Sequence, residues 1–205
     1  FGGGDAVNIL KKNLCNIITS CSEDDLEWLP ENDRNIERII FEKTSSLLES
    51  NIIIAKQSSK EIVECIKKNI SNNKANKYFF NEDYNFVSME NDFFYYEDKY
   101  GSLKIPKPGM SGQFQLENAS TAIASLRVLE NLKIRDEQII KGIKNAYNSA
   151  RLEEIKSGKL KDLVKNNKLI IDSSHNPGGS KAINEYLQTL NCNKHVIVGM
   201  MENKD

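Results

Sequence analysis

Residues 51–66 read NIIIAKQSSKEIVECI, and this stretch decides the fold class of the first half of the chain. Asn51–Ala55 is a short β-branched run, which predicts a strand. Ser58 or Ser59 then caps a helix whose apolar residues recur at helical spacing. These apolar residues are Ile62, Cys65, Ile66 and Ile70. A strand that runs into a helix in this way is typical of a parallel sheet.

The same order occurs upstream of this stretch. Leu14–Thr19 reads as a strand that enters a polar loop, Ser20–Asp25. Asn32 and Asp33 can cap a helix over Arg34–Leu48. The resulting β-α-β-α order predicts an α/β domain.

The next part of the sequence has a different pattern. Short aromatic or β-branched runs, separated by Asn, Asp and Gly, predict antiparallel hairpins. The runs are Lys77–Phe80, Tyr84–Met89, Asp92–Tyr96 and Ser102–Ile105. After a loop at Pro106–Gly112, helical spacing predicts helices over Asn118–Leu129 and Asp136–Tyr147.

The strand and helix pattern restarts near Ser149. Predicted strands at Leu152–Ile155, Lys168–Asp172 and His195–Val198 surround a predicted helix at Lys181–Leu190. We therefore expect two domains, residues 1–149 and residues 150–205. Because residue 1 is Phe in a glycine run and a strand-like run ends the sequence without a closing helix, we expect both domains to be incomplete.

Composition narrows the class of protein. Of 205 residues, 39% are hydrophobic and 28% are charged, the balance of a globular protein that can bury a core. A net charge of −1 gives no electrostatic reason to expect a nucleic acid or an anionic membrane as partner. The four cysteines fit no C-x-x-C or zinc pattern, so we expect reduced thiols in a cytoplasmic protein. No apolar run reaches the ~20 residues of a membrane span.

Asp172 and His175 are the first candidate site residues. In open α/β sheets, ligands bind beyond the carboxyl ends of strands, and Asp172 lies at such an end. Its carboxylate can accept a bond from a ribose hydroxyl, and His175 can donate to a phosphate oxygen. Ser180, placed before the next helix, puts backbone N–H groups nearby. The alternative is that Asp172 forms a turn and that His175 only fills a loop.

Lys43 lies on the same helical stripe as Ile36, Ile40 and Leu47. A lysine at such a position either extends to solvent and pairs with a carboxylate, or stays partly buried with a lowered pKa. A partly buried amine can take up CO2 as a carbamate, an anion that can bind Mg²⁺ or anchor a substrate.

Three further positions carry suitable chemistry. Asp24 and Asp25 follow a strand, and their oxygens suit a hard cation unless they are ordinary loop residues. Gln115 and Asn118 can read a purine edge or simply cap a helix, since both amides donate and accept. Arg151, at the predicted domain junction, can hold a phosphate with two bonds or lie on the surface. The sequence contains no G-x-x-x-x-G-K-[ST] phosphate loop.

Seven segments in collinear order resemble the folylpolyglutamate synthase and dihydrofolate synthase family of the Mur ligase superfamily. They are Gly2-Gly-Gly-Asp-Ala-Val-Asn8, Ile18-Thr-Ser-Cys-Ser-Glu-Asp-Asp25, Phe41-Glu-Lys43, Gly112-Gln-Phe-Gln-Leu-Glu-Asn-Ala119, Ala150-Arg-Leu-Glu153, Asp172-Ser-Ser-His-Asn-Pro177 and Gly199-Met-Met-Glu-Asn-Lys-Asp205. They are similar to the family patterns G-G-R-x-D-A-T-N, I-T-S-I-G-x-D-H, E-K-A-G-I, G-x-H-Q-x-x-N-A, G-R-L-E, D-x-A-H-N-P and G-x-M-x-D-K-D. The resemblance spans nearly the whole chain.

The resemblance implies a fold and an activity. The fold would be part of a Mur-ligase-like ATPase domain, with a parallel sheet, helices and a small antiparallel region, followed by part of a Rossmann-like C-terminal α/β domain. The activity would be an ATP- and Mg²⁺-dependent amide ligase that joins L-glutamate to dihydropteroate or a reduced folate. The protein would be a cytoplasmic monomer. The segments that carry the family's phosphate loop and its metal-binding glutamate would precede Phe1.

The resemblance also implies roles for individual residues. Asn118, with Gln115 nearby, would contact adenine. Asp172 would hold the ribose and Arg151 the phosphates. The catalytic candidates would be His175, close to the nucleotide, and Lys43, the lysine that becomes a carbamate.

Several positions depart from the family pattern. Asp25 stands where the family has a metal-binding histidine, the first motif lacks its arginine, and Ala150 replaces a glycine. A peptidoglycan Mur-type ligase shares the expected architecture and chemistry and is one alternative. A nucleotide-binding module that has lost catalysis is the other, and the replacement at Asp25 favours it.

Overall fold

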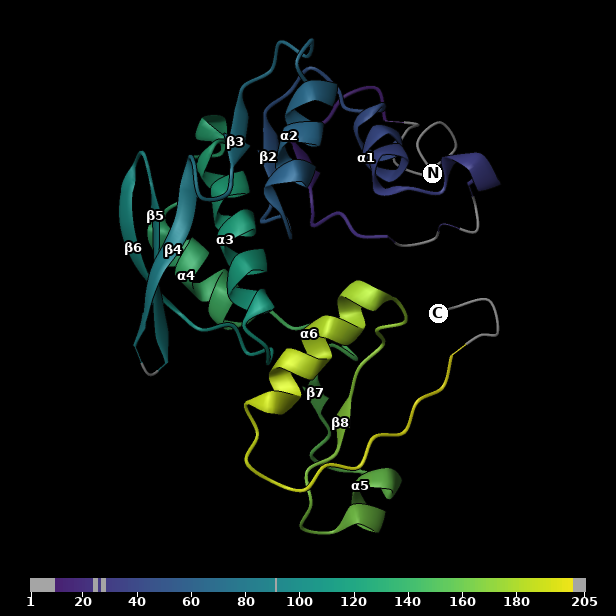
Figure 1. Ribbon diagram of the computed structural model, residues 1–205. Helices are drawn as coiled ribbons and strands as arrows, with labels where there is room; N and C mark the ends of the chain where they lie inside the picture. The colour runs from purple at the N-terminus through teal and green to yellow at the C-terminus, as the bar shows by residue number, and fades with distance from the viewer. Residues whose placement is uncertain (1–9, 24–25, 27–28, 91, 201–205) are drawn as a thin grey trace.

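The computed structural model describes residues 10–23, 26, 29–90 and 92–200 of the chain. A parallel sheet in the order β1-β2-β3 forms its first unit, with strands β1 (Asn16–Ile18), β2 (Ile52–Ile54) and β3 (Lys77–Phe79). Helices α1 (Ile36–Thr44) and α2 (Lys60–Asn69) connect these strands, as Figure 1 shows. The predicted β-α-β-α order is confirmed.

The helix starts follow from capping. The side chain of Ser59 accepts a hydrogen bond from the backbone N–H of Ile62 and caps α2, as expected. Helix α1 is capped instead by Asn35, whose side chain accepts from the N–H of Arg38 at 2.8 Å. The predicted cap at Asn32 and Asp33 is wrong because these residues belong to a short 3₁₀ helix, Glu31–Asp33.

Strand β2 is buried on both faces, which explains its unbroken run of isoleucines. Side chains of a strand alternate between the two faces of a sheet. Ile52 and Ile54 pack with Ile40 of α1 and Ile66 of α2, whereas Ile53 belongs to the core on the other face. The sheet therefore joins two hydrophobic clusters.

The second unit is an antiparallel sheet of β4 (Tyr84–Glu90), β5 (Phe93–Asp98) and β6 (Gly101–Pro106). The prediction that Lys77–Phe80 is part of the hairpins is wrong. This segment forms β3, which pairs in parallel with β2, since α2 returns the chain to the end of the sheet where β2 begins. Aromatic strand residues suit either kind of sheet, so their composition did not distinguish the two.

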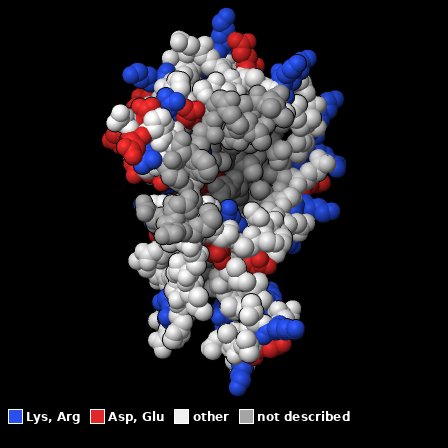
Figure 2. Space-filling view, turned by 90° about the vertical axis from the view of Figure 1, so that its right-hand side faces the viewer, with Lys and Arg blue, Asp and Glu red and all other residues white. Residues whose placement is uncertain are grey.

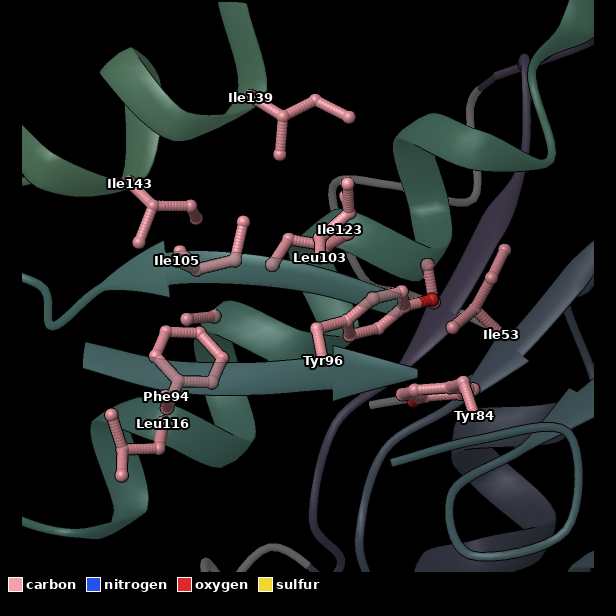
Figure 3. Packing of buried hydrophobic residues seen from close by; sticks show 12 residues of the cluster. Ile53, Tyr84, Phe94, Tyr96, Leu103, Ile105, Leu116, Ile123, Ile139 and Ile143 are labelled. Atoms are coloured by element: carbon pink, nitrogen blue, oxygen red, sulfur yellow. The ribbon is translucent and has the colours of Figure 1, made fainter. Parts of the chain in front are cut away.

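Two helices cover the core between the sheets. Helix α3 (Phe114–Arg127) begins four residues before the predicted Asn118, and α4 (Asp136–Lys144) follows a 3₁₀ helix at Glu130–Leu132. Figure 3 shows the side chains of β2, β5, β6 and the two helices converging in this cluster. The labelled members are Ile53, Tyr84, Phe94, Tyr96, Leu103, Ile105, Leu116, Ile123, Ile139 and Ile143.

The last part of the chain forms β7 (Glu153–Glu154), α5 (Lys159–Val164), β8 (Ile170–Ile171) and α6 (Pro177–Gln188). Strands β7 and β8 pair antiparallel. These elements gather in the lower part of Figure 1, and α6 lies nearest to the first unit. The domain boundary at residues 149 and 150 stays a prediction.

The predicted strand at His195–Val198 is wrong. These residues have no regular secondary structure, and Ile197 is 99% exposed. A strand needs a neighbour to accept its backbone hydrogen bonds, and within the described residues no strand pairs with this segment.

The surface carries charges of both signs. Figure 2 shows basic and acidic residues interspersed on the face in view, in agreement with the net charge of −1. Among the described residues, no helix is long and apolar enough to cross a membrane.

Candidate functional site

Asp172 follows β8 and fastens the loop that begins there. One oxygen of its carboxylate, Oδ2, accepts a hydrogen bond from the backbone N–H of Leu152 at 2.8 Å. The other, Oδ1, accepts from the N–H of Ser174 at 2.7 Å. Asp172 is therefore a turn former, and each of its oxygens keeps a second lone pair for a further donor such as a ribose hydroxyl.

Arg151 occupies an unusual turn that is bonded to the same loop. The residues on both sides of it, Ala150 and Leu152, have positive φ angles of 53° and 47°. The backbone N–H of Ser173 donates to the carbonyl of Ala150 at 2.9 Å, so the turn and the Asp172 loop form one unit. Leu152 is buried, whereas Arg151 is exposed. The turn thus displays the guanidinium to the outside.

Glu153 completes this turn. Its Oε2 accepts from the N–H of Ala150 at 2.8 Å, and its Oε1 accepts from the hydroxyl of Tyr147 at 2.6 Å. These bonds, the one from Ala150 first, hold the pKa of Glu153 below its usual value. The sequence pattern contained Glu153 but assigned it no role, because its partners are set by the left-handed turn.

His175 is exposed on the loop between Asp172 and α6. Its Nδ1 lies 3.0 Å from the carbonyl oxygen of Ser173. With the proton on Nδ1, the ring donates to this carbonyl and Nε2 is left as an acceptor; in the imidazolium form, Nε2 is a donor instead. A protonated His175 therefore suits a phosphate oxygen.

Helix α6 begins earlier than expected. Asn176 is its cap, and the side chain accepts from the N–H of Gly179 at 2.8 Å. The expectation that Ser180 precedes the helix is wrong, since its N–H already donates to the carbonyl of Asn176 within the helix. The first turn, which carries the partial positive charge of the helix, lies at Pro177–Gly179.

The start of α6 faces the loop that follows β1. A Cβ atom added at Gly178 would lie 3.3 Å from Oγ of Ser22, so the two segments are in close contact. Gln57 braces the β1 loop, since its Oε1 accepts from the N–H of Cys21 at 2.8 Å. Its Nε2 donates to the carbonyls of Ala55 and Thr19. The loop after β1, held by Gln57, thus contacts the start of α6 through Ser22, and the sequence pattern assigned neither Gln57 nor Ser22 a role.

Lys43 lies near the same β1 loop. Burial raises the pKa of the Cys21 thiol, and the positive charge of Lys43 partly lowers it, which places the ammonium within electrostatic range of Cys21. Of the two alternatives for Lys43, the partly buried one is wrong, because the residue is exposed. The buried residues of α1 are Ile39, Ile40 and Glu42, so Lys43 lies outside the buried face of the helix.

Gln115 and Asn118 lie at the start of α3. The side-chain N–H of Asn118 donates to Oε1 of Gln115 at 3.2 Å. Gln115 is buried, and Asn118 is exposed. Glu117 between them forms an ion pair with Lys56, at 2.6 Å, which ties this helix to the end of β2. No hydrogen bond or ion pair among the described residues joins Gln115 or Asn118 to the Asp172 loop.

The predicted metal ligand Asp25, with Asp24, lies outside the described residues. Within those residues, no group of three His, Cys, Asp or Glu side chains is arranged to hold a metal ion. The expected use of Mg²⁺ therefore stays a prediction.

One cavity in the described part lies away from these residues. It has a volume of about 370 Å³ and opens between β4, β5 and the end of α3. Two of its acidic side chains are already paired, Glu82 with Lys67 at the surface and Asp98 with Arg127 in a largely buried position. A smaller cavity of about 240 Å³ lies at the carboxyl ends of β2 and β3, next to Lys56 and the start of α2. Ligands of parallel sheets bind beyond the carboxyl ends of the strands, which is where the smaller cavity lies.

Solved structures of other proteins share the fold of this chain. No protein-family model matches the sequence, and no curated protein matches it either. Solved structures do match, among them a point mutant of L. casei FPGS, at 20% identity and a TM-score of 0.75 over 97% of this chain. The chain has the fold of part of a folylpolyglutamate synthase. It covers 48% of that L. casei chain, so it spans about half its length.

Two further matching structures are complexes with ligands. The M. tuberculosis folylpolyglutamate synthase complexed with ADP and AMPPCP matches at 19% identity and a TM-score of 0.73, over 90% of this chain and 41% of its own. E. coli FolC in complex with DHPP and ADP matches at 24% identity and a TM-score of 0.73, over 93% and 41%. At these identities the likeness establishes the fold alone.

Proposed function

We propose that the protein is an ATP-dependent amide ligase that joins L-glutamate to the carboxylate of a dihydropteroate or a reduced folate. ATP phosphorylates the carboxylate, which gives an acyl phosphate and ADP. The amino nitrogen of glutamate then attacks the carbonyl carbon and loses a proton, and the bond to the phosphate oxygen breaks. The products are an amide, ADP and phosphate.

One observation carries this proposal: the Arg151 turn and the Asp172 loop form one hydrogen-bonded unit beside the start of α6, which touches the loop after β1. An exposed guanidinium, an exposed imidazole and a helix N-terminus next to the carboxyl edge of a parallel sheet suit a polyphosphate. The shared fold with enzymes crystallised with AMPPCP and ADP supports the same use.

The residues have separate roles in this proposal. Arg151 holds phosphate oxygens through two parallel N–H bonds. His175 donates Nε2–H to a phosphate oxygen when its ring is protonated, and Asp172 accepts from a ribose hydroxyl with its remaining lone pairs. Asn118, with Gln115 behind it, binds the adenine edge.

Lys43 and Asp25 would act away from the nucleotide base, Lys43 as a carbamate and Asp25 as a metal ligand. A carbamate on Lys43 rests on the resemblance alone, because the residue is exposed, and Asp25 would bind Mg²⁺ together with the nucleotide phosphates. Asp25 lies outside the described residues.

ADP release by the complete gene product tests the proposal. The assay contains ATP, Mg²⁺ and glutamate, with dihydropteroate, tetrahydrofolate or a UDP-muramyl peptide in separate wells. Release that requires both a pterin and glutamate supports the ligase and names its acceptor. Release with the UDP-muramyl peptide alone would instead establish a peptidoglycan ligase.

A nucleotide-binding module without catalysis is the second candidate, favoured by the exposed Lys43 and by Asp25 in place of the family's histidine. It predicts that ATP binds but that no well releases ADP. Calorimetric titration with AMPPCP alongside the assay separates this result from a protein that does not bind nucleotide at all.

A further inference from the structure

The turn at Arg151 has a backbone conformation that residues other than glycine rarely adopt. Ala150 and Leu152 both have positive φ angles, and neither is glycine. A left-handed conformation is unfavourable for an L-residue, because it brings Cβ too close to the following carbonyl oxygen. Such conformations persist only where surrounding contacts hold them, and they gather at functional sites.

Hydrogen bonds from three segments hold this turn. Glu153 binds Ala150 and Tyr147, Asp172 binds Leu152, and the N–H of Ser173 binds the carbonyl of Ala150. Leu152 adds an anchor, since only 3% of it is exposed. The conformation is therefore fixed from both sides of Arg151.

Arg151 itself takes no part in this network. It is exposed, and no ion pair to it forms within the described residues. The nearest acid in the sequence, Glu153, has both oxygens engaged by the N–H of Ala150 and the hydroxyl of Tyr147. The network thus keeps a neighbouring carboxylate away from the guanidinium and leaves the guanidinium for an external anion.

We propose that Glu153 and Asp172 are positioning residues that hold the Arg151 guanidinium in place to bind nucleotide phosphates. This inference rests on the proposed function, which supplies the nucleotide. Asp172 would act through the bonds that its carboxylate accepts from backbone N–H groups. Glu153 gains a role that the sequence pattern did not assign to it. Tyr147 supports Glu153 from the preceding loop.

A double-mutant cycle on the complete gene product tests the inference, with the dissociation constant for AMPPCP measured by calorimetry. Arg151→Ala is expected to weaken binding by roughly tenfold or more, since charge-assisted hydrogen bonds contribute about 1.5–3 kcal/mol. Glu153→Ala should weaken binding by about threefold to tenfold when Arg151 is present. It should have no effect in the Arg151→Ala background, because its action passes through the guanidinium.

Two further variants serve as controls for a general loss of structure. Glu154→Ala removes the same charge one residue later, where Glu154 only pairs with Lys168 on the surface, and should leave the affinity unchanged. Tyr147→Phe removes one hydroxyl from a side chain that is 68% exposed, and should weaken binding less than Glu153→Ala. Circular dichroism melts show whether each variant is folded.

The outcomes separate the two proposals. Unchanged affinity in Arg151→Ala would overturn the role of Arg151 and with it part of the proposed function. Weaker binding in Arg151→Ala, together with an equal effect of Glu153→Ala or Tyr147→Phe in both backgrounds, would overturn the positioning role alone.

Discussion

Replacing Ala150 by glycine should stabilise the protein. Ala150 has a φ angle of 53°. At this angle the backbone conformation of an L-residue costs about 1–2 kcal/mol of folding free energy, whereas glycine has no such cost. Glycine also gives the unfolded chain more conformational freedom, and this lowers the free energy of unfolding by about 0.4–1 kcal/mol. The difference leaves a net gain of about 1 kcal/mol, and the backbone bonds to Glu153 and Ser173 are kept.

Urea unfolding measures this gain. With a slope of about 2 kcal/mol per molar urea, a gain of ~1 kcal/mol raises the midpoint by about 0.5 M. A chain of this size should also melt about 2–4 °C higher. Ala122→Gly is the matched control, because Ala122 is exposed inside α3. There the same substitution should destabilise by about 1 kcal/mol. A lower midpoint for Ala150→Gly would refute the strain at this turn.

Three further changes have defined outcomes. Gly112→Ala should destabilise by roughly 1–3 kcal/mol in urea melts, since its φ is 100° and a Cβ would lie 2.4 Å from the ring of Phe114; an unchanged midpoint would contradict this. Arg127→Met should cost about 3–5 kcal/mol, because it leaves the carboxylate of Asp98 (7% exposed) without its partner at 3.1 Å; adding Asp98→Asn should recover part of the loss. The pKa of Glu153 is lowered by folding, so its stabilisation is present above about pH 4.5 and is lost as the pH falls. The midpoint difference between the wild type and Glu153→Gln should therefore shrink below that pH, and a difference that grows would refute the shift.

The sequence predicted the elements that depend on local patterns. The isoleucines of β2 and the serine cap of α2 lie where expected, because a buried strand and an N-cap are specified by neighbouring residues. The assignment of β3 failed because parallel or antiparallel pairing depends on where α2 returns the chain. The prediction of a strand at His195–Val198 was wrong because strand propensity alone does not supply a neighbouring strand to pair with.

The candidate site was predicted in part for a similar reason. Asp172, His175 and Arg151 stay predictions as site residues, and the structure shows only that Asp172 and the Arg151 turn are hydrogen-bonded to each other. Glu153 and Gln57 hold their loops mainly through bonds to backbone groups, which no side-chain pattern encodes. Lys43 was placed on the apolar stripe, but the buried residues of α1 are Ile39, Ile40 and Glu42, and Lys43 is exposed.

Transfer of oxygen from the pterin carboxylate to phosphate tests the proposed chemistry most directly. The complete gene product would be incubated with ATP, glutamate and an acceptor whose carboxylate carries a heavy isotope of oxygen. An acyl phosphate places one carboxylate oxygen between carbon and phosphorus, and attack by glutamate releases this oxygen with the phosphate. We therefore predict inorganic phosphate that carries one heavy oxygen. Unlabelled phosphate, formed together with the glutamyl amide, would contradict the acyl phosphate route.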